Sequence, residues 1–290
     1  MAYLRKSQIL VGPYDGSMLV ICENMRTTFS ITRTSKDSQA EISIYNLSED
    51  TRNKITTCKD KQGRQQVILK AGYEDEGDLG LLWYGDVYYV EHVYKQPEWI
   101  TKIESSSGLV AQKEPVSMAW AKDVSGKALM EYMVKLFKLT IDKKTMDAAI
   151  KAVNADKIKW VQGFSCNCTV GDGLTLIAKR LLLEWSVQNQ TLRVTKVGSD
   201  DGSDSYDLSA VLVGSPERTR QQRKSEAGDA GPLYGWRVRC LLCPKILPRA
   251  RIRIPDSSKV KNVDLIVEKV VHSGDTHGGA WDTTIESKDM

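Results

Sequence analysis

The chain has 290 residues, which is long for one domain and favours two or three folded units. Its apolar and charged fractions, 41% and 27%, are ordinary for a globular protein. A formal net charge of +4 is too small to indicate a nucleic-acid or membrane partner for the chain as a whole.

The first ten residues are polar and lack an apolar core flanked by basic residues, so the sequence predicts no export signal. No apolar run approaches the length of a membrane span, and we expect no membrane segment. We therefore expect the protein to be made and folded in the cytosol with reduced thiols. The six cysteines are Cys22, Cys58, Cys166, Cys168, Cys240 and Cys243.

The first third of the chain alternates apolar and polar side chains in one short run after another, which predicts β-strands. One short helix interrupts them, because Ser48 can cap it and Ile55 can turn inward. An acidic loop at residues 74–78 precedes three more strands, at 79–84, 87–94 and 99–104. Gly85-Asp86 predicts a tight turn between the first two. We expect residues 1–115 to form a β-barrel with one helix.

Beyond residue 115 the apolar period changes from two to about 3.6, which indicates helices. Asp123 or Ser125 can cap the first helix, Thr145 begins the second, and the third covers residues 171–183. A strand hairpin follows, with its turn at Asn189-Gln190. These elements predict an α+β domain over residues 116–200.

Residues 198–205 are rich in Ser, Asp and Gly and predict a linker. A strand is expected at 208–213, and residues 217–231 predict an exposed basic loop because almost none are apolar. Alternating runs at 236–240, 251–254, 265–271 and 281–285 then predict a second antiparallel β-barrel over residues 201–290. The predicted fold class is mainly β, with two small antiparallel β-barrels and a helix-containing middle domain.

Several stretches resemble the central baseplate hub of tailed bacteriophages, the tube-to-spike hub family that includes late control protein D. They are Gly-Trp-Arg-Val-x-Cys-Leu-Leu-x-Pro from Gly235 to Pro244, and Val-x-His-Ser-Gly-Asp-Thr-x-Gly-Gly-x-Trp from Val270 to Trp281. Residues 40–48 and 84–87 resemble the first tube-like domain of the same family. The likeness follows the order of most of the chain, and its motifs carry no catalytic residue.

The resemblance implies a homotrimer in which six similar barrels present quasi-sixfold symmetry to a hexameric tail tube. The true threefold axis would suit a trimeric central spike. Implied partners are the tail tube protein, the central spike protein and other baseplate proteins, with DNA passing through a channel without specific binding. The implied location is the tail baseplate of the virion, after assembly in the host cytoplasm.

One set of residues has the composition of a metal site, because two thiolates and two imidazoles can hold zinc. It consists of Cys240, Cys243, His272 and His277. The two pairs lie much farther apart than in a zinc finger, and Cys240 points away from Cys243 on an extended strand. Half-buried thiols are the simpler interpretation, also for Cys166 and Cys168. We predict no metal and no cofactor.

His272, Ser273 and Asp275 are the residue types of a hydrolase triad, but neighbours in one loop do not align as a triad does. Gly171-Asp172-Gly173 lacks the Lys-Ser/Thr that follows in a phosphate-binding loop, so a helix start is the better interpretation. No pair of carboxylates stands out as a glycosidase pair. We predict no catalytic residue and no enzyme activity.

Ten basic residues between Arg218 and Arg253 exceed the acids Glu217, Glu226 and Asp229 by about seven charges. We favour a basic face that meets an acidic surface on a neighbouring subunit. A solvated surface and nucleic-acid contact remain as alternatives. Two other functions also stay open: a peptidoglycan-degrading tail hydrolase, tested by zymogram, and an oligonucleotide-binding barrel protein, tested by salt-sensitive binding to single strands.

Overall fold

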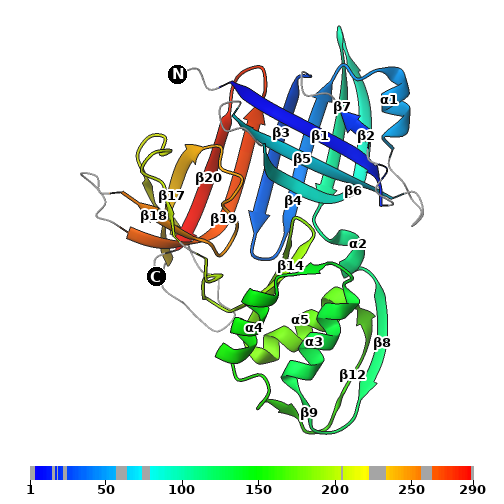
Figure 1. The fold of residues 1–290 in the computed structure, drawn as a ribbon, viewed down its shortest axis with the longest axis vertical. Helices are drawn as coiled ribbons and strands as arrows, with labels where there is room; N and C mark the ends of the chain where they lie inside the picture. The colour runs from blue at the N-terminus through cyan, green and yellow to red at the C-terminus, as the bar shows by residue number, and fades with distance from the viewer. Residues whose placement is uncertain are drawn as a thin grey trace.

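The computed structural model describes residues 4–14, 17, 19–21, 25–56, 64–73, 79–203, 205–221, 233–255 and 263–288. Within these residues the fold is mainly β, which confirms the predicted class (Figure 1). No helix in the described ranges has both the length and the apolar character needed to cross a membrane.

The N-terminal β unit contains strands β1 to β7 and two short helices. Their bounds are β1 (Arg5–Pro13), β2 (Leu19–Ile21), β3 (Thr27–Thr34), β4 (Ser38–Tyr45), α1 (Glu49–Lys54), β5 (Gln65–Tyr73), β6 (Gly80–Lys95), β7 (Glu98–Ser106) and α2 (Leu109–Gln112). The predicted helix is confirmed: Ser48 Oγ accepts a hydrogen bond from the backbone N of Thr51 at 3.2 Å, and Ile55 is fully buried.

The middle module follows as β8 (Pro115–Trp120), β9 (Val124–Ser125), α3 (Gly126–Leu136), β10 (Thr140–Ile141), α4 (Lys143–Ala152), β11 (Lys159–Trp160), β12 (Phe164–Thr169), α5 (Val170–Leu181), β13 (Leu183–Gln188) and β14 (Thr191–Lys196). The three predicted helices are confirmed, with side-chain caps from Ser125, Asp142 and Thr169. The predicted hairpin turn is also confirmed, since Asn189 and Gln190 have φ values of 50° and 59°.

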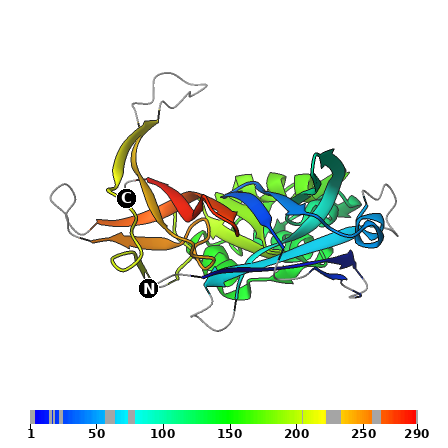
Figure 2. The ribbon, with the colours of Figure 1, turned by 90° about the horizontal axis from the view of Figure 1, so that it is seen from above.

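The C-terminal β unit contains β15 (Tyr206–Asp207), β16 (Glu217–Gln221), β17 (Leu233–Leu241), β18 (Arg251–Ile254), β19 (Val263–Asp275) and β20 (Trp281–Lys288). The hairpin expected over the last tract is confirmed as β19–β20. Strands β16 and β17, in yellow tones, form an arm that projects from the body (Figure 2).

The predicted pair of closed barrels is wrong. The strands of the two β units form one 13-stranded sheet that runs β16-β17-β20-β19-β3-β4-β7-β6-β5-β1-β2, with β18 paired to β19 and β15 paired to β18. Strands β8 to β14 of the middle module form three small sheets of their own. Strand β19 pairs along seven residues with β3, from Lys269 opposite Thr34 to Asp275 opposite Thr28. Local alternation predicts strands but leaves their long-range partners undetermined, so this joint between the two β units was not foreseen.

The sheet curls so that β1 and β5 cross over β3 and β4 (Figure 1). Strand β6 makes the bend, because its first half pairs with β5 and its second half with β7. Apolar side chains from both layers meet inside, among them Ile9, Leu69, Ile31 and Ile42. A second core lies in the C-terminal β unit, around Val238, Ile252, Leu265 and Ile285, and a third lies in the middle module, around α3 and α5.

Three element predictions need correction. Gly85-Asp86 is not a turn, because β6 continues through it. A Cβ on Gly85 would lie 2.7 Å from Ser105 Oγ and 2.8 Å from the ring of Trp83, so this glycine permits close packing. Residues 208–213 form turns after β15 instead of a strand, and residues 217–221 form β16 instead of the start of a loop. The rest of that predicted basic loop, 222–231, lies outside the described residues.

Candidate functional site

A continuous polar face crosses seven strands of the sheet, from β17 through β20, β19, β3, β4 and β7 to β6. Residues directly opposite each other in antiparallel strands share a face, and the pairing gives unbroken rows such as Asp282, Ser273, Ser30, Glu41, Glu104 and Tyr89. We call this surface the polar face. Its members are Arg237, Arg239, Asp282, Thr284, Glu286, Lys269, Val271, Ser273, Ser30, Thr32, Thr34, Gln39, Glu41, Ser43, Lys102, Glu104, Ser106, Tyr89 and Glu91.

The opposite side of the same strands is buried. Between the polar positions stand Val238, Ile285, Val270, Ile31 and Ile42, each at most 1% exposed. One side of the sheet therefore packs against the apolar cores of the two β units. The other side, the polar face, extends over both units. A sheet with one packed and one solvated side is the ordinary result of strict alternation in antiparallel strands.

The charges of the polar face nearly balance. Arg237 pairs with Glu286 at 2.8 Å, Arg239 with Asp282 at 2.6 Å, and Lys102 with Glu91 at 3.2 Å. Glu41 and Glu104 lie directly opposite each other on β4 and β7, an arrangement that weakens strand pairing through like-charge repulsion. The wall is thus polar and close to neutral, with a carboxylate pair near its centre.

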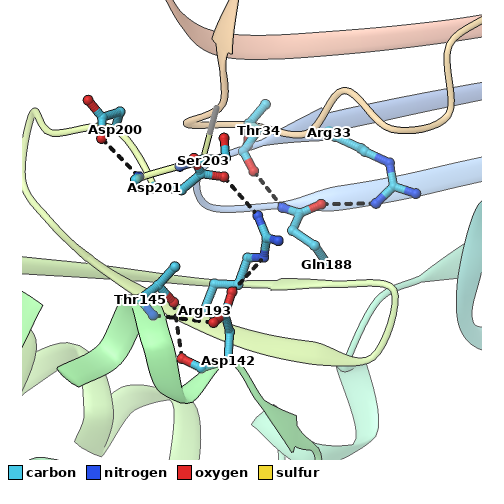
Figure 3. A network of polar contacts seen from close by, with 10 residues as sticks. Arg33, Thr34, Asp142, Thr145, Gln188, Arg193, Asp200, Asp201 and Ser203 are labelled. Atoms are coloured by element: carbon cyan, nitrogen blue, oxygen red, sulfur yellow. Dashed lines mark hydrogen bonds and ion pairs between the residues drawn. The ribbon is translucent and has the colours of Figure 1, made fainter. Parts of the chain in front are cut away.

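A buried polar junction fixes the middle module to the N-terminal β unit. Arg33, fully buried on β3, donates from Nη1 to Gln188 Oε1 at 3.0 Å and from Nη2 to Asn189 Oδ1 at 2.7 Å. Gln188 Nε2 in turn donates to the carbonyl of Thr34 at 3.0 Å (Figure 3). Burial and the charge of Arg193 lower the pKa of Arg33 to about 9. The tip of the β13–β14 hairpin is therefore locked into the sheet by charge-assisted hydrogen bonds.

Asp86 anchors the other side of the same hairpin tip. It is 2% exposed, and its carboxylate accepts hydrogen bonds from Tyr14 Oη at 2.5 Å, from the backbone N of Val110 at 3.0 Å and from Gln190 Nε2. Burial and the neighbouring Asp86 raise the pKa of Tyr14 far above its ordinary value. Residues of both units line a cavity of about 400 Å³ at this place.

Ion pairs join the middle module to the C-terminal β unit. Arg193 on β14 reaches Asp201, beyond the end of the middle module, at 3.2 Å, and within the module it also lies 3.6 Å from Asp142, the cap of α4 (Figure 3). Arg249 reaches Glu184 at 2.5 Å. Because all three units are tied together by buried or half-buried polar contacts, the polar face is carried by a stiff frame.

The structure brings three of the four residues of the zinc hypothesis, Cys240, Cys243 and His272, into contact with Thr283, and it leaves His277 apart from them. Cys240 is buried on the inner side of β17, whereas Cys243 lies beyond the end of that strand. His272 is fully buried with Nδ1 2.9 Å from Thr283 Oγ1, and His277 lies in the exposed turn after β19. Within the described ranges no group of three or more His, Cys, Asp or Glu side chains is placed to hold a metal ion.

The other candidate sets are likewise parts of the fold. Ser273 lies on the opposite side of β19 from His272, and Asp275 forms an ion pair with Arg26 at 3.2 Å, so no triad assembles. Cys166 and Cys168 share one side of β12, where burial and Cys168 raise the pKa of Cys166 to about 11. Gly171-Asp172-Gly173 forms the first turn of α5. Cys22 and Cys58 lie outside the described residues.

Five of the ten basic residues between 218 and 253, namely Arg237, Arg239, Arg249, Arg251 and Arg253, form ion pairs within the chain, and Arg223 and Lys224 lie outside the described residues. Besides the two pairs on β17, Arg251 Nε lies 2.6 Å from Asp200, and Arg253 Nε lies 2.9 Å from Asp264. Arg218 stacks on Tyr234 and Trp236 along the β16–β17 arm. Contact between this basic region and an acidic surface on a neighbouring subunit stays a prediction. The ion pairs within the chain reduce the positive charge that is available for such a contact.

Sequence reasoning missed Arg33, Asp86, Gln188 and Gln190, which hold the frame together. Only Arg33 left a signal, because it occupies an inward position in the alternating run Phe29, Ile31, Arg33. A charged side chain on the buried side of a strand indicates a paired polar network.

Comparison with known proteins identifies the family. The family model described as "Baseplate hub gp41" matches residues 11–162, more than half of the chain. The protein belongs to the baseplate hub gp41 family. It is therefore a structural protein of a bacteriophage tail, located in the baseplate of the virion. No curated protein sequence matches this hub.

Solved structures share the fold of the hub at low sequence identity. The 43 kDa tail protein of prophage MuSo2 from Shewanella oneidensis has a TM-score of 0.61 at 10% identity, covering 98% of each chain. A tail protein of Neisseria meningitidis MC58 has a TM-score of 0.60 at 10% identity, covering 98% of the hub and 96% of that chain. The Escherichia coli c3393 protein of the type VI secretion system has a TM-score of 0.56 at 9% identity, covering 97% and 76%.

Proposed function

We propose that this hub is a homotrimeric ring whose channel is lined by the polar face. The observation that carries the proposal is the continuity of that face across both β units. A channel lined by polar side chains with almost no net charge would neither attract the phosphates of DNA electrostatically nor place them against an apolar surface. DNA would pass such a wall without being held.

The ring would adapt one symmetry to another. Each chain contributes two β units to one sheet, so three copies place six β units around the axis. These six would face a hexameric tail tube, while the threefold axis would suit a trimeric central spike. The description of the Escherichia coli protein with the same fold, as similar to the T4 tail proteins gp27 and gp5, supports this role.

On this proposal the hub acts without catalysis. It would bind the tail tube protein, the central spike protein and other baseplate proteins, and it would be assembled in the host cytoplasm. We also propose that the chain divides into domains near residues 115 and 200. The separate apolar cores of the middle module and of the C-terminal β unit support that division, while Leu242 and Trp281 pack into the N-terminal core.

Mass measurement and imaging of the purified hub test the ring. We expect native mass spectrometry to give three chain masses, alone or with the tube and spike proteins present. Cryo-electron microscopy should then show a threefold ring with Thr32 and Glu41 facing a channel wide enough for a DNA duplex. A ring with the polar face on its outside, or a chain that stays monomeric with both partners present, would contradict the proposal.

A further inference from the structure

The ribbon of β8 and β12 carries three sulfur atoms on the side that it turns toward helix α5. Successive residues of a strand point to opposite sides, so Cys166 and Cys168 share one side of β12. Met118 on β8 lies directly opposite Cys166, and such cross-strand neighbours stand about 5 Å apart at Cβ. This side faces the core of the middle module, since Met118 packs against that core while the alternate residues Ser165 and Asn167 are exposed.

A fourth sulfur atom approaches the thiols from helix α3. A Cβ on Gly173 of α5 would lie 3.4 Å from Cys168 Sγ, 3.7 Å from Met133 Sδ and 2.5 Å from Met133 Cε. The glycine therefore leaves the space in which the fully buried Met133 comes close to Cys168. The two thiols also contact each other, because burial and then a hydrogen bond with Cys168 raise the pKa of Cys166.

Two thiols and two thioethers make a set of ligands for a soft metal ion. Thiolate and thioether sulfur favour Cu(I), whereas structural zinc sites use Cys and His, and Mg²⁺ and Ca²⁺ take oxygen ligands. We propose that Cys166, Cys168, Met118 and Met133 together bind one Cu(I) ion. Each thiol exchanges its S–H bond for an S–Cu bond, and both protons pass to solvent. Copper stays in the +1 state, so binding requires no oxidant or reductant.

The β8–β12 ribbon is the part of the middle module that such an ion would stabilise. Among the described strands, β8 and β12 pair only with each other, and a two-stranded sheet by itself is marginally stable in water. Ligands from β8, β12 and α3 would fix the ribbon to the helical core. We expect saturating Cu(I) to raise the melting temperature of the wild type by about 3 °C or more.

Anaerobic titration of the reduced protein with Cu(I), in competition with the chelator bicinchoninate, tests the site. The variant with both Cys166→Ser and Cys168→Ser should bind one equivalent of Cu(I) fewer than the wild type. X-ray absorption at the copper edge should show that this equivalent has sulfur neighbours only. Uptake that is equal in the double variant and the wild type would mean that copper binds adventitiously elsewhere, and it would overturn the proposal.

The thioethers distinguish this site from a simple pair of thiols. Met118→Leu with Met133→Leu keeps apolar side chains of similar volume in the core, so the fold should be retained. The affinity for the Cu(I) equivalent should fall by about tenfold or more, and the rise in melting temperature should be lost. Met146→Leu is the matched control, because this methionine lies on α4, which packs on β14.

The control variant should change the Cu(I) affinity by less than about twofold. An affinity of the double methionine variant equal to that of the wild type would overturn the four-sulfur site, as would nitrogen or oxygen neighbours in the absorption spectrum. Circular dichroism checks the fold of each variant. If the double cysteine variant does not fold, the methionine variants and the spectrum of the wild type decide the proposal.

Discussion

His272 and Arg33 place ionisable groups on the buried side of the sheet. His272 is fully buried, its Nδ1 contacts Thr283, and its Nε2 has no hydrogen-bond partner among the described residues. Burial, together with the positive charge of Arg33, holds the pKa of His272 well below its ordinary value. The imidazole is therefore neutral in the folded hub, and its protonation opposes folding.

The stability of the hub should fall in mildly acidic solution because of His272. Below about pH 6.5 the unfolded chain binds a proton at this residue and the folded chain does not. Each pH unit below that value then removes up to about 1.4 kcal/mol from the free energy of unfolding. Denaturant titrations at pH 6.5 and pH 5 should show this loss in the wild type and a smaller one in His272→Asn.

His277→Asn is the control for this experiment, since His277 is exposed in the turn after β19. It should keep the wild-type difference between the two pH values. An equal difference in His272→Asn and wild type would show that other groups cause the acid sensitivity.

Residue-scale features were predictable where their causes are local. The cap at Ser48 and the left-handed turn at Asn189-Gln190 depend on neighbours within a few residues, and both were found from the sequence. Arg33 was missed as a junction residue because its partners Gln188 and Asn189 lie about 155 positions away. A pattern of apolar residues within a short window of sequence cannot show a contact between residues so far apart in the chain.

At the scale of elements, Gly274 is the residue on which the joint between β19 and β3 depends. It lies opposite Phe29, and a Cβ at this position would approach Phe29 Cζ to 2.2 Å and Trp281 Cε3 to 2.8 Å. Phe29 and Trp281 pack edge to face with ring centroids 5.4 Å apart. The glycine leaves room for both rings at the place where the two β units meet.

Gly274→Val should lower the free energy of unfolding by about 2 kcal/mol or more, because the added side chain displaces one of the two rings. Chemical denaturation followed by tryptophan fluorescence measures this change. Ser273→Ala on the polar face of the same strand should change stability by less than about 0.5 kcal/mol. A Gly274→Val hub as stable as the wild type would mean that the joint tolerates repacking.

Element predictions failed where pairing is decided at long range. Strand β6 was divided at Gly85-Asp86 because that dipeptide is a turn signal in isolation. In the fold, Gly85 lies under Trp83, and Asp86 receives three hydrogen bonds from other segments. The prediction of closed barrels failed for a similar reason. Alternation shows which side of a strand is buried, but it does not show which strands pair with each other.

At the scale of the whole molecule, Glu41 and Glu104 test whether the polar face is a channel wall. The two carboxylates oppose each other across β4 and β7, where mutual repulsion works against the fold. We interpret their presence as a means of keeping the wall from attracting DNA. Glu41→Lys with Glu104→Lys reverses this charge without adding volume to a core.

We expect this double variant to assemble like the wild type but to bind double-stranded DNA about tenfold more tightly at low salt, with an affinity that falls as salt rises. Mobility-shift titrations measure the affinity, and DNA ejection from particles that carry the variant should slow. Asp147→Lys with Asp156→Lys makes the same change on exposed positions of the middle module. Equal DNA binding by both double variants would contradict a special role for the polar face.

The seven-residue ladder between β19 and β3 restricts how a ring of these chains can change shape. Backbone hydrogen bonds run from one β unit into the other without interruption, so neither unit can swivel alone unless the ladder breaks. In the proposed ring, any widening of the channel would therefore occur at the contacts between copies, with each copy moving as one rigid body.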